Sequence, residues 1–182
     1  KEGLPNFQPR WGRQTHAFSS TSFWSPNKSW ERIKGHKVTG INRKENKLYL
    51  YDEAELYYQD MELKAGIIVL DYSINEVTAG RIPDSSGVLI QTPYFKQTNN
   101  EIYPDSLRFN FDTQKALIWN SNSAQNGMNV YAAFTKKEND SVYYIKDAKV
   151  TTGGSLEESD YYFRIRKGKM VPQGKIVTGF TN

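Results

Sequence analysis

The sequence contains no cysteine, which excludes disulfide bonds, cysteine-based zinc sites and thiol nucleophiles. It also contains no run of about 18 apolar residues, the length that a membrane-spanning helix needs. The only two histidines are His16 and His36, and their spacing is not that of a metal-ligand pair. These absences remove the usual protein ligands of zinc and predict a chain without a metal site.

Sequence motifs of catalysis are missing as well. There is no G-x-S-x-G nucleophile elbow, no phosphate-binding G-x-x-x-x-G-K-[ST] loop and no G-x-G-x-x-G fingerprint. Paired carboxylates hydrolyse glycosides when they face each other across a cleft. Here they lie beside predicted turns or on outward strand positions, so solvated side chains are expected at Asp52/Glu53, Asp60/Glu62 and Glu157/Glu158. The chain is predicted to be neither an enzyme nor a cofactor-binding protein.

The charges of the chain are mixed in sign and interspersed. The 182 residues include 24 Lys and Arg against 20 Asp and Glu, which gives a net charge of +4. Nucleic-acid binding calls for cations clustered on one surface, so no nucleic-acid partner is predicted. A mild positive balance suits contact with phosphorylated or anionic headgroups.

Apolar residues recur at every second position from about residue 37 onward. Leu48 and Leu50 alternate with polar or aromatic neighbours, as do the apolar residues of segments 54–58 and 61–65. This period is typical of strands with one buried face, and no stretch shows helical spacing. The aromatic content of 14%, with 12 Tyr, also favours strands. The fold is predicted to be all-β, with turns at 43–46, 72–75, 83–87, 99–100, 112–114, 138–140 and 153–154.

A weak internal repeat runs through this region. The segment from Ile68 to Ala79 aligns with the segment from Leu107 to Ile118, with Asp71 and Asn110 at matching positions, and Val38–Leu50 fits more loosely. The predicted unit is a strand, an Asx residue that caps its own turn, and a second strand. Hairpins repeated in this way build an elongated sheet.

The alternation predicts one inward-facing apolar surface. Its members are Leu48, Leu50, Leu56, Ile68, Leu70, Leu107, Phe109, Phe111, Ile118, Val130 and Phe134. In a closed roll these residues are the hydrophobic core. In an open, V-shaped roll they line a slot wide enough for acyl chains, and periodicity does not separate the two interpretations.

Two further segments have more than one interpretation. Tyr161–Lys169 mixes rings with cations, and it fits a strand with Tyr161, Phe163 and Ile165 inside, a contact with anionic headgroups, or a nucleic-acid contact. Residues 1–36 are rich in Trp and Pro and show no strand or helix period. They are predicted to form an irregular arm that precedes a domain covering residues 37–182.

Several segments of residues 37–180, in order, resemble the organic-solvent-tolerance (OstA-like) family. Ala54, Tyr58, Asp60, Leu63 and Ala65 match the A-x-x-x-Y-x-D-x-x-L-x-A hairpin of that family. Further matches are Pro83–Gly87, Tyr103–Phe111, Val142–Lys146, Val150–Thr152, Tyr161–Arg164 and Val171–Gly179. The family comprises the N-terminal periplasmic domain of the lipopolysaccharide-assembly outer-membrane protein and its soluble bridge relatives.

The resemblance implies a twisted β-jelly-roll, open in a V shape, whose apolar interior passes the acyl chains of lipopolysaccharide. It assigns lipid binding to the inward apolar surface defined above. It implies contact of the lipid A phosphates with Arg108, Arg164, Arg166 or Lys169.

The same resemblance implies a location in the periplasm at the outer membrane of a Gram-negative envelope. The expected partners are lipopolysaccharide, like β-roll modules joined by edge-strand pairing, and an outer-membrane β-barrel. That barrel is expected to be either the continuation of this chain or a separate protein, since Asn182 falls where a barrel begins in full-length relatives. No cofactor is implied.

A second function stays open at this point. A carbohydrate-binding, lectin-like β-sandwich module of the cell envelope needs exposed aromatic platforms, and Trp11, Trp24 and Trp119 are candidates for them.

Overall fold

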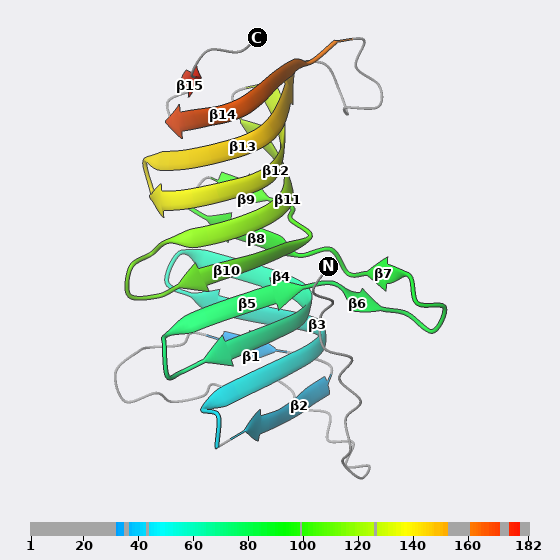
Figure 1. Cartoon of the computed structure of the whole chain (residues 1–182). Coiled ribbons are helices and arrows are strands. Elements are labelled where there is room, and N and C mark those ends of the chain that lie inside the picture. The colour runs from blue at the N-terminus through cyan, green and yellow to red at the C-terminus, as the bar shows by residue number, and fades with distance from the viewer. Residues whose placement is uncertain are drawn as a thin grey trace.

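The computed structural model describes residues 32–34, 37–42, 44–98, 100–125, 127–152, 161–171 and 175–178. These residues form strands and turns, and none of them forms a helix that is long and apolar enough to cross a membrane. The all-β prediction is confirmed (Figure 1). The strands are β1 (Arg32–Lys34), β2 (Lys37–Asn42), β3 (Lys47–Tyr58), β4 (Met61–Asp71), β5 (Glu76–Gly80), β6 (Ile82–Pro83), β7 (Leu89–Ile90), β8 (Tyr94–Gln97), β9 (Asn100–Ile102), β10 (Ser106–Asn110), β11 (Ala116–Gln125), β12 (Met128–Asn139), β13 (Val142–Thr151), β14 (Phe163–Val171) and β15 (Lys175–Thr178).

Thirteen strands form one antiparallel sheet that does not close on itself. Its order is β1-β3-β4-β5-β10-β11-β12-β13-β14-β15, with β2 beside β3, β8 beside β4, and β9 beside β8. Strands β6 and β7 form a separate hairpin that projects from the body (Figure 1). Strand β1 pairs with β3 although it lies within the segment assigned to the N-terminal arm, and residues 1–31 of that arm lie outside the described residues.

The sheet folds into two walls because its long strands bend. The first wall contains β2, β5, β10, β15 and the segments 47–51, 67–71, 116–119, 134–139, 142–146 and 167–171. The second wall contains β1, β8, β9 and the segments 54–58, 61–65, 121–125, 128–132, 148–151 and 163–165. Figure 1 shows the first wall in front, with the strands turning at the right toward the second wall.

A reversal of the inward side accompanies the bend. In β4, Met61, Leu63 and Ala65 are buried in the second wall, whereas Ile68 and Leu70 are buried in the first, so the odd positions give way to the even ones. The buried positions also switch parity at the bend in β13 and β14, from odd to even, and in β11 and β12, from even to odd. A left-handed backbone residue marks the bend in β11 and β13, namely Asn120 (φ 49°) and Asp147 (φ 49°). The reversal keeps the apolar side chains inside as each strand passes the corner.

Gly66 occupies the bend of β4, and its position has no room for a side chain. It lies opposite the two bulged residues Asp52 and Glu53 of β3. A Cβ atom on Gly66 would come within 2.9 Å of the backbone nitrogen of Ile82 and within 2.8 Å of the Ile82 side chain. The bend therefore requires glycine here, because backbone blocks the added atom.

We expect Gly66→Ala to lower the free energy of unfolding by about 1–3 kcal/mol through overpacking. Gly80→Ala is the matched control, because its Cβ would meet only an Ile67 methyl at 3.8 Å, and no loss of stability is expected there. Urea unfolding monitored by tryptophan fluorescence measures both. Equal effects of the two substitutions would show that Gly66 does not constrain the bend.

The predicted repeat corresponds to two matching hairpins of the first wall. Leu70 lies opposite Val77 in β4 and β5, just as Phe109 lies opposite Ala116 in β10 and β11. The Asp71 carboxylate accepts hydrogen bonds from Ser73. The Asn110 side-chain oxygen accepts them in the equivalent turn, from the Asp112 and Thr113 backbones at 3.1 and 2.9 Å. The Asx capping role is confirmed at both positions.

Candidate functional site

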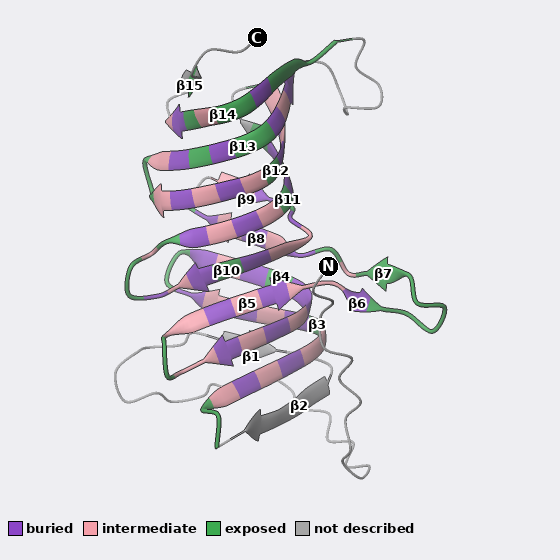
Figure 2. Cartoon of the chain, viewed as in Figure 1, coloured by how far each residue is buried: buried purple, intermediate pink, exposed green. Residues whose placement is uncertain are grey.

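The space between the two walls is the candidate site, and it is lined by the predicted apolar surface. Ten of the eleven predicted residues are at most 5% exposed, and the eleventh is Phe134. Aromatic rings from opposite walls meet there: Phe95 of β8 and Phe109 of β10 have ring centroids 5.9 Å apart. Figure 2 shows the buried positions alternating along the strands. Nine of the ten buried residues belong to one packed core between the walls, and Val130 belongs to a second, smaller cluster.

The inward placement of Phe134 is wrong. Phe134 is half-buried and lies opposite Trp119, and the two rings make an edge contact at 5.8 Å. The buried neighbour is Thr135, which lies opposite Ile118 and Ile145. The bend of β12 explains the difference. Strict alternation starting from Val130 would place Phe134 inside, but the strand changes its inward side between these two residues.

The interior also contains polar side chains that the alternation of apolar residues does not reveal. Ser121 and Thr135 are buried with their hydroxyl oxygens 3.3 Å apart. The Lys137 side chain is 1% exposed, and its Nζ donates to the Gln114 carbonyl at 3.0 Å and to Asp140 at 2.7 Å. The lysine thereby closes the interior at the end of the first wall. Its signal in the sequence is weak, since Lys137 follows another lysine beside a turn.

A smaller apolar cluster continues toward the C-terminus. It consists of Val130, Ala132, Ile145, Ala148, Val150 and Ile165, with Met128 packed against it. Phe163 points to the same inner side of the sheet as the buried Ile165, and yet it is 68% exposed. The inner face is therefore open to solvent at the second-wall end of β14. Of the three residues that the strand interpretation places inside, Ile165 is buried, whereas Phe163 lies on the inner side but is exposed, and Tyr161 precedes the strand and is exposed. No further strand covers that part of β14 among the described residues.

The strand ends of the two walls meet along a seam opposite the bend. There the walls are joined by side chains: Gln97 Nε2 donates to Gln114 Oε1 at 3.2 Å, and Asn100 Nδ2 donates to the Tyr143 hydroxyl at 3.4 Å. The Tyr58 and Phe111 rings add an edge contact at 5.1 Å. Burial raises the pKa of Tyr143 to about 12, so its hydroxyl is neutral at the seam.

The Gln97 amide is incompletely paired. Its side chain is buried, and its Oε1 has no hydrogen-bond partner in the structure. Its Nε2 donates over 3.2 Å to Gln114 and over 3.5 Å to Asp60. A buried acceptor without a donor costs about 1–3 kcal/mol, which weakens the closed seam.

We expect Gln97→Met to leave the free energy of unfolding unchanged or to raise it by about 1 kcal/mol, because an apolar side chain of similar volume removes the unpaired oxygen. Gln114→Met is the contrasting variant. It removes a good donor to the Phe111 carbonyl at 2.8 Å and is expected to cost about 1 kcal/mol. Urea unfolding compares them. A loss of stability in Gln97→Met as large as that in Gln114→Met would show that the Gln97 amide is well paired.

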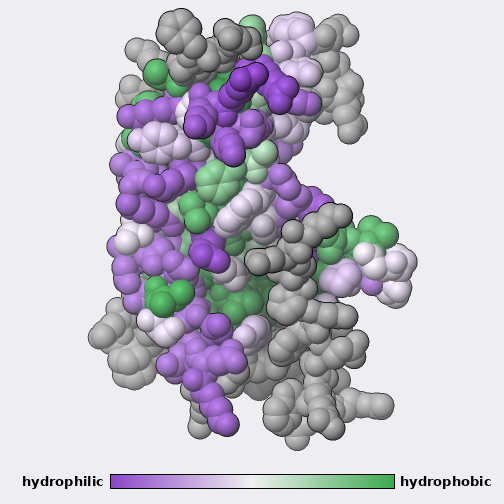
Figure 3. All heavy atoms as spheres, in the orientation of Figure 1, coloured by the Kyte–Doolittle hydropathy of each residue, from purple (hydrophilic) through white to green (hydrophobic). Residues whose placement is uncertain are grey.

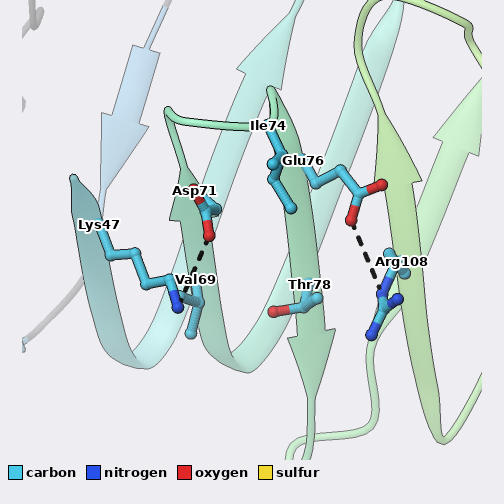
Figure 4. Close-up of a pocket in the computed structure, with 7 residues that line it drawn as sticks. All are labelled: Lys47, Val69, Asp71, Ile74, Glu76, Thr78 and Arg108. Carbon is cyan, nitrogen blue, oxygen red and sulfur yellow. Dashed lines mark ion pairs between the residues drawn. The ribbon is translucent and has the colours of Figure 1, made fainter. Parts of the chain in front are cut away.

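The four cations predicted to contact phosphates lie on the outer surface. Arg108 projects from β10 into a shallow hollow of about 260 Å³ on the outer face of the first wall. Figure 4 shows that it faces Glu76, with 3.8 Å between the charged groups, while Lys47 pairs with Asp71 at 3.5 Å. The other three, Arg164, Arg166 and Lys169, are exposed along β14. The structure thus separates Arg108 from the β14 cations.

Those residues of the competing interpretations that the structure describes are not brought together. Trp119 packs against Phe134, while Trp11 and Trp24 lie outside the described residues, as do Glu157 and Glu158. Asp52 accepts a hydrogen bond from Gln91 at 2.8 Å, and Glu62 pairs with Lys64 at 2.7 Å. Within the described ranges, no group of three or more His, Asp or Glu side chains is arranged to hold a metal ion.

Comparison with known proteins gives a likeness in structure. No family model matches the sequence, and no curated protein matches it. Among solved structures, the chain is similar to LptH from Pseudomonas aeruginosa, described as the LptA-homologous periplasmic component of the lipopolysaccharide transport device. The TM-score is 0.48 at 10% sequence identity, and the match covers 77% of this chain and 93% of that chain.

Proposed function

We propose that this chain is a non-catalytic conduit that holds the acyl chains of lipopolysaccharide between its two walls, in the periplasm at the outer membrane. The observation that carries the proposal is the construction of the interior. Apolar side chains from both walls line it, and among the described residues only side chains join the walls along the seam between Gln97–Gln114 and Asn100–Tyr143. The ordered motif matches of residues 37–180 to the OstA-like family support the same conclusion.

The free-energy cost of opening the seam is small compared with the free energy gained when acyl chains enter the interior. Separating the walls breaks neutral side-chain hydrogen bonds worth about 1 kcal/mol each and parts the rings of Phe95 and Phe109, and it leaves the backbone ladders of both walls intact. Apolar surface removed from water contributes roughly 25 cal/mol per Å², so transferring several acyl chains into the slot is worth tens of kcal/mol. Acyl chains therefore replace the contacts between the walls as the roll opens.

The lipid phosphates remain outside in this account. Arg108, Arg164, Arg166 and Lys169 are the candidates for contact with them, and Arg164 and Lys169 lie near the two ends of β14, where a headgroup leaves the slot. The second-wall edge of β14, which no described strand covers, offers backbone groups and the exposed Phe163 ring. That edge is the proposed site at which a like β-roll module or an outer-membrane barrel adds a strand.

Direct binding tests the proposal. The full chain is mixed with purified lipid A, and native mass spectrometry records the stoichiometry of the complex. We expect lipid A to bind and to displace a fluorescent fatty acid from the protein. Binding on a glycan array without lipid A binding would favour the lectin-like function, and displacement by free sugar would contradict the conduit.

A further inference from the structure

The outer face of β13 and β14 gathers cations that are scattered in the sequence. Six side chains form this basic face: Lys146, Lys149, Arg164, Arg166, Lys167 and Lys169. All are exposed except Lys149, which is half-buried. The one carboxylate of the described residues on this outer face is Asp147, at the bend of β13. Figure 3 shows strongly hydrophilic side chains crowded over these strands at the top of the view.

The register places like charges directly opposite each other. Lys146 of β13 faces Lys167 of β14, and Lys149 faces Arg164. Directly opposed like charges in a sheet are destabilising. Among the described residues, none of the six cations forms an ion pair with a carboxylate. In the part of the chain that the structure describes, no ion pair with a carboxylate relieves this repulsion.

Elsewhere in the sheet, described cations face or pair with carboxylates. Lys47 faces Asp71 and pairs with it at 3.5 Å, and Lys96 faces Glu101 and pairs with it at 2.9 Å. Farther along the first wall, Lys115 and Lys136 both pair with Glu138, and these hydrogen bonds lower the pKa of that carboxyl to about 2. These cations pair with carboxylates, whereas those of the basic face, within the part of the chain that the structure describes, do not.

We propose that the basic face docks on a bilayer surface that carries anionic phosphate headgroups. Charge complementarity favours a broad anionic surface, because the cations extend across the bend of β14 from Arg164 to Lys169. A single headgroup leaving the seam reaches only one end of this face. The proposal does not require the interior to hold lipid, so it stands or falls separately from the conduit.

The aromatic side chains beside this face favour a lipid over a nucleic acid. Tyr144, Tyr161 and Tyr162 are 43–59% exposed, and tyrosine is typical of the interface between membrane and water. Base stacking needs a free ring face, whereas Lys149 Nζ lies 4.8 Å from the centroid of the Tyr162 ring. Phe163 belongs to the inner side of the sheet and is not available on the outer face.

Vesicle binding by the full chain tests the proposal. Co-sedimentation is measured with phosphatidylcholine vesicles and with vesicles of phosphatidylcholine mixed with phosphatidylglycerol. We expect binding to the anionic vesicles alone, weakening as salt is raised. The basic-face variant carries Lys146→Gln, Lys149→Gln, Arg164→Gln and Lys167→Gln. Its affinity is expected to fall roughly a hundredfold to a thousandfold, since each cation near an anionic surface contributes to binding.

The matched control removes the same number of cations from paired positions. It carries Lys47→Gln, Lys64→Gln, Lys96→Gln and Lys115→Gln, and less than about a tenfold loss of vesicle affinity is expected. The basic-face variant is also expected to melt at a temperature equal to or above that of the parent chain, because the opposed like charges are gone. This second measurement shows that any loss of binding is not a loss of folding.

Three results would overturn the proposal. Equal vesicle affinities of the two variants would assign the binding to net charge. Binding of a single-stranded oligonucleotide without binding of anionic vesicles would assign the face to nucleic acid. Release of the vesicles by inorganic phosphate at low concentration, but not by chloride at equal ionic strength, would indicate a discrete phosphate site instead of a membrane-docking surface.

Discussion

Phe109→Ala is expected to lower the free energy of unfolding by about 3–5 kcal/mol, the cost of removing a buried aromatic side chain. Phe109 is 1% exposed and touches the rings of Phe95 from the second wall and Phe111 at centroid distances of 5.9 and 5.4 Å. Its loss leaves a cavity between the walls that neither ring fills alone. Urea unfolding, supported by the melting temperature, measures the change.

Phe134→Ala is the control for this substitution. Phe134 is also a strand phenylalanine of the first wall, but it is half-buried on the outer face against Trp119. Its replacement is expected to cost about 1 kcal/mol, the size of an aromatic pair contact together with partial burial. Equal losses in the two variants would contradict the assignment of Phe109 to the inside and Phe134 to the outside.

Locking the seam is expected to abolish lipid loading. Because the chain has no cysteine, Gln97→Cys combined with Gln114→Cys provides two thiols of defined position, and a short cleavable bis-maleimide can join them. The cross-link ties the walls together and leaves the bend untouched, so acyl chains have no entry along the seam. Lipid A binding, measured by displacement of a fluorescent fatty acid, is expected to fall at least about a hundredfold and to return when the linker is cleaved.

A cross-link within one wall is the matched control. Asp60 and Thr98 both belong to turns of the second wall, and the Thr98 hydroxyl donates to the Asp60 carboxylate at 2.8 Å. Asp60→Cys combined with Thr98→Cys, treated with the same reagent, is expected to keep its lipid binding. Undiminished loading of the Gln97/Gln114 cross-linked protein would show that lipid does not enter through the seam.

The strands and their turns are largely predictable from this sequence. Apolar residues at every second position, such as Leu48 and Leu50, identify half-buried strands. The Asx residues Asp71 and Asn110 mark turns that the structure confirms. The inner apolar face was predictable as well, apart from Phe134. These features depend on local spacing and on side chains that bond to their own turn, so they require no knowledge of which strands pair.

The bend and the seam were not predictable, for a physical reason. The bend changes the inward side within single strands, and a left-handed residue such as Asn120 or Asp147 gives only a weak local signal for it. The seam joins side chains distant in sequence, such as Asn100 and Tyr143. The basic face arises in the same way, since Lys146 and Lys167 become neighbours only through strand pairing.

Site-specific photocrosslinking tests the central claim most directly. A photoreactive phenylalanine analogue replaces Leu70, Phe109 or Ile118, which face inward, and in matched variants it replaces Val69 or Leu117, which neighbour them on the outer side. After illumination with lipopolysaccharide, a conduit predicts labelled lipid at the inward positions and little at the outward ones. Labelling confined to the outward positions would show that the space between the walls is only a hydrophobic core.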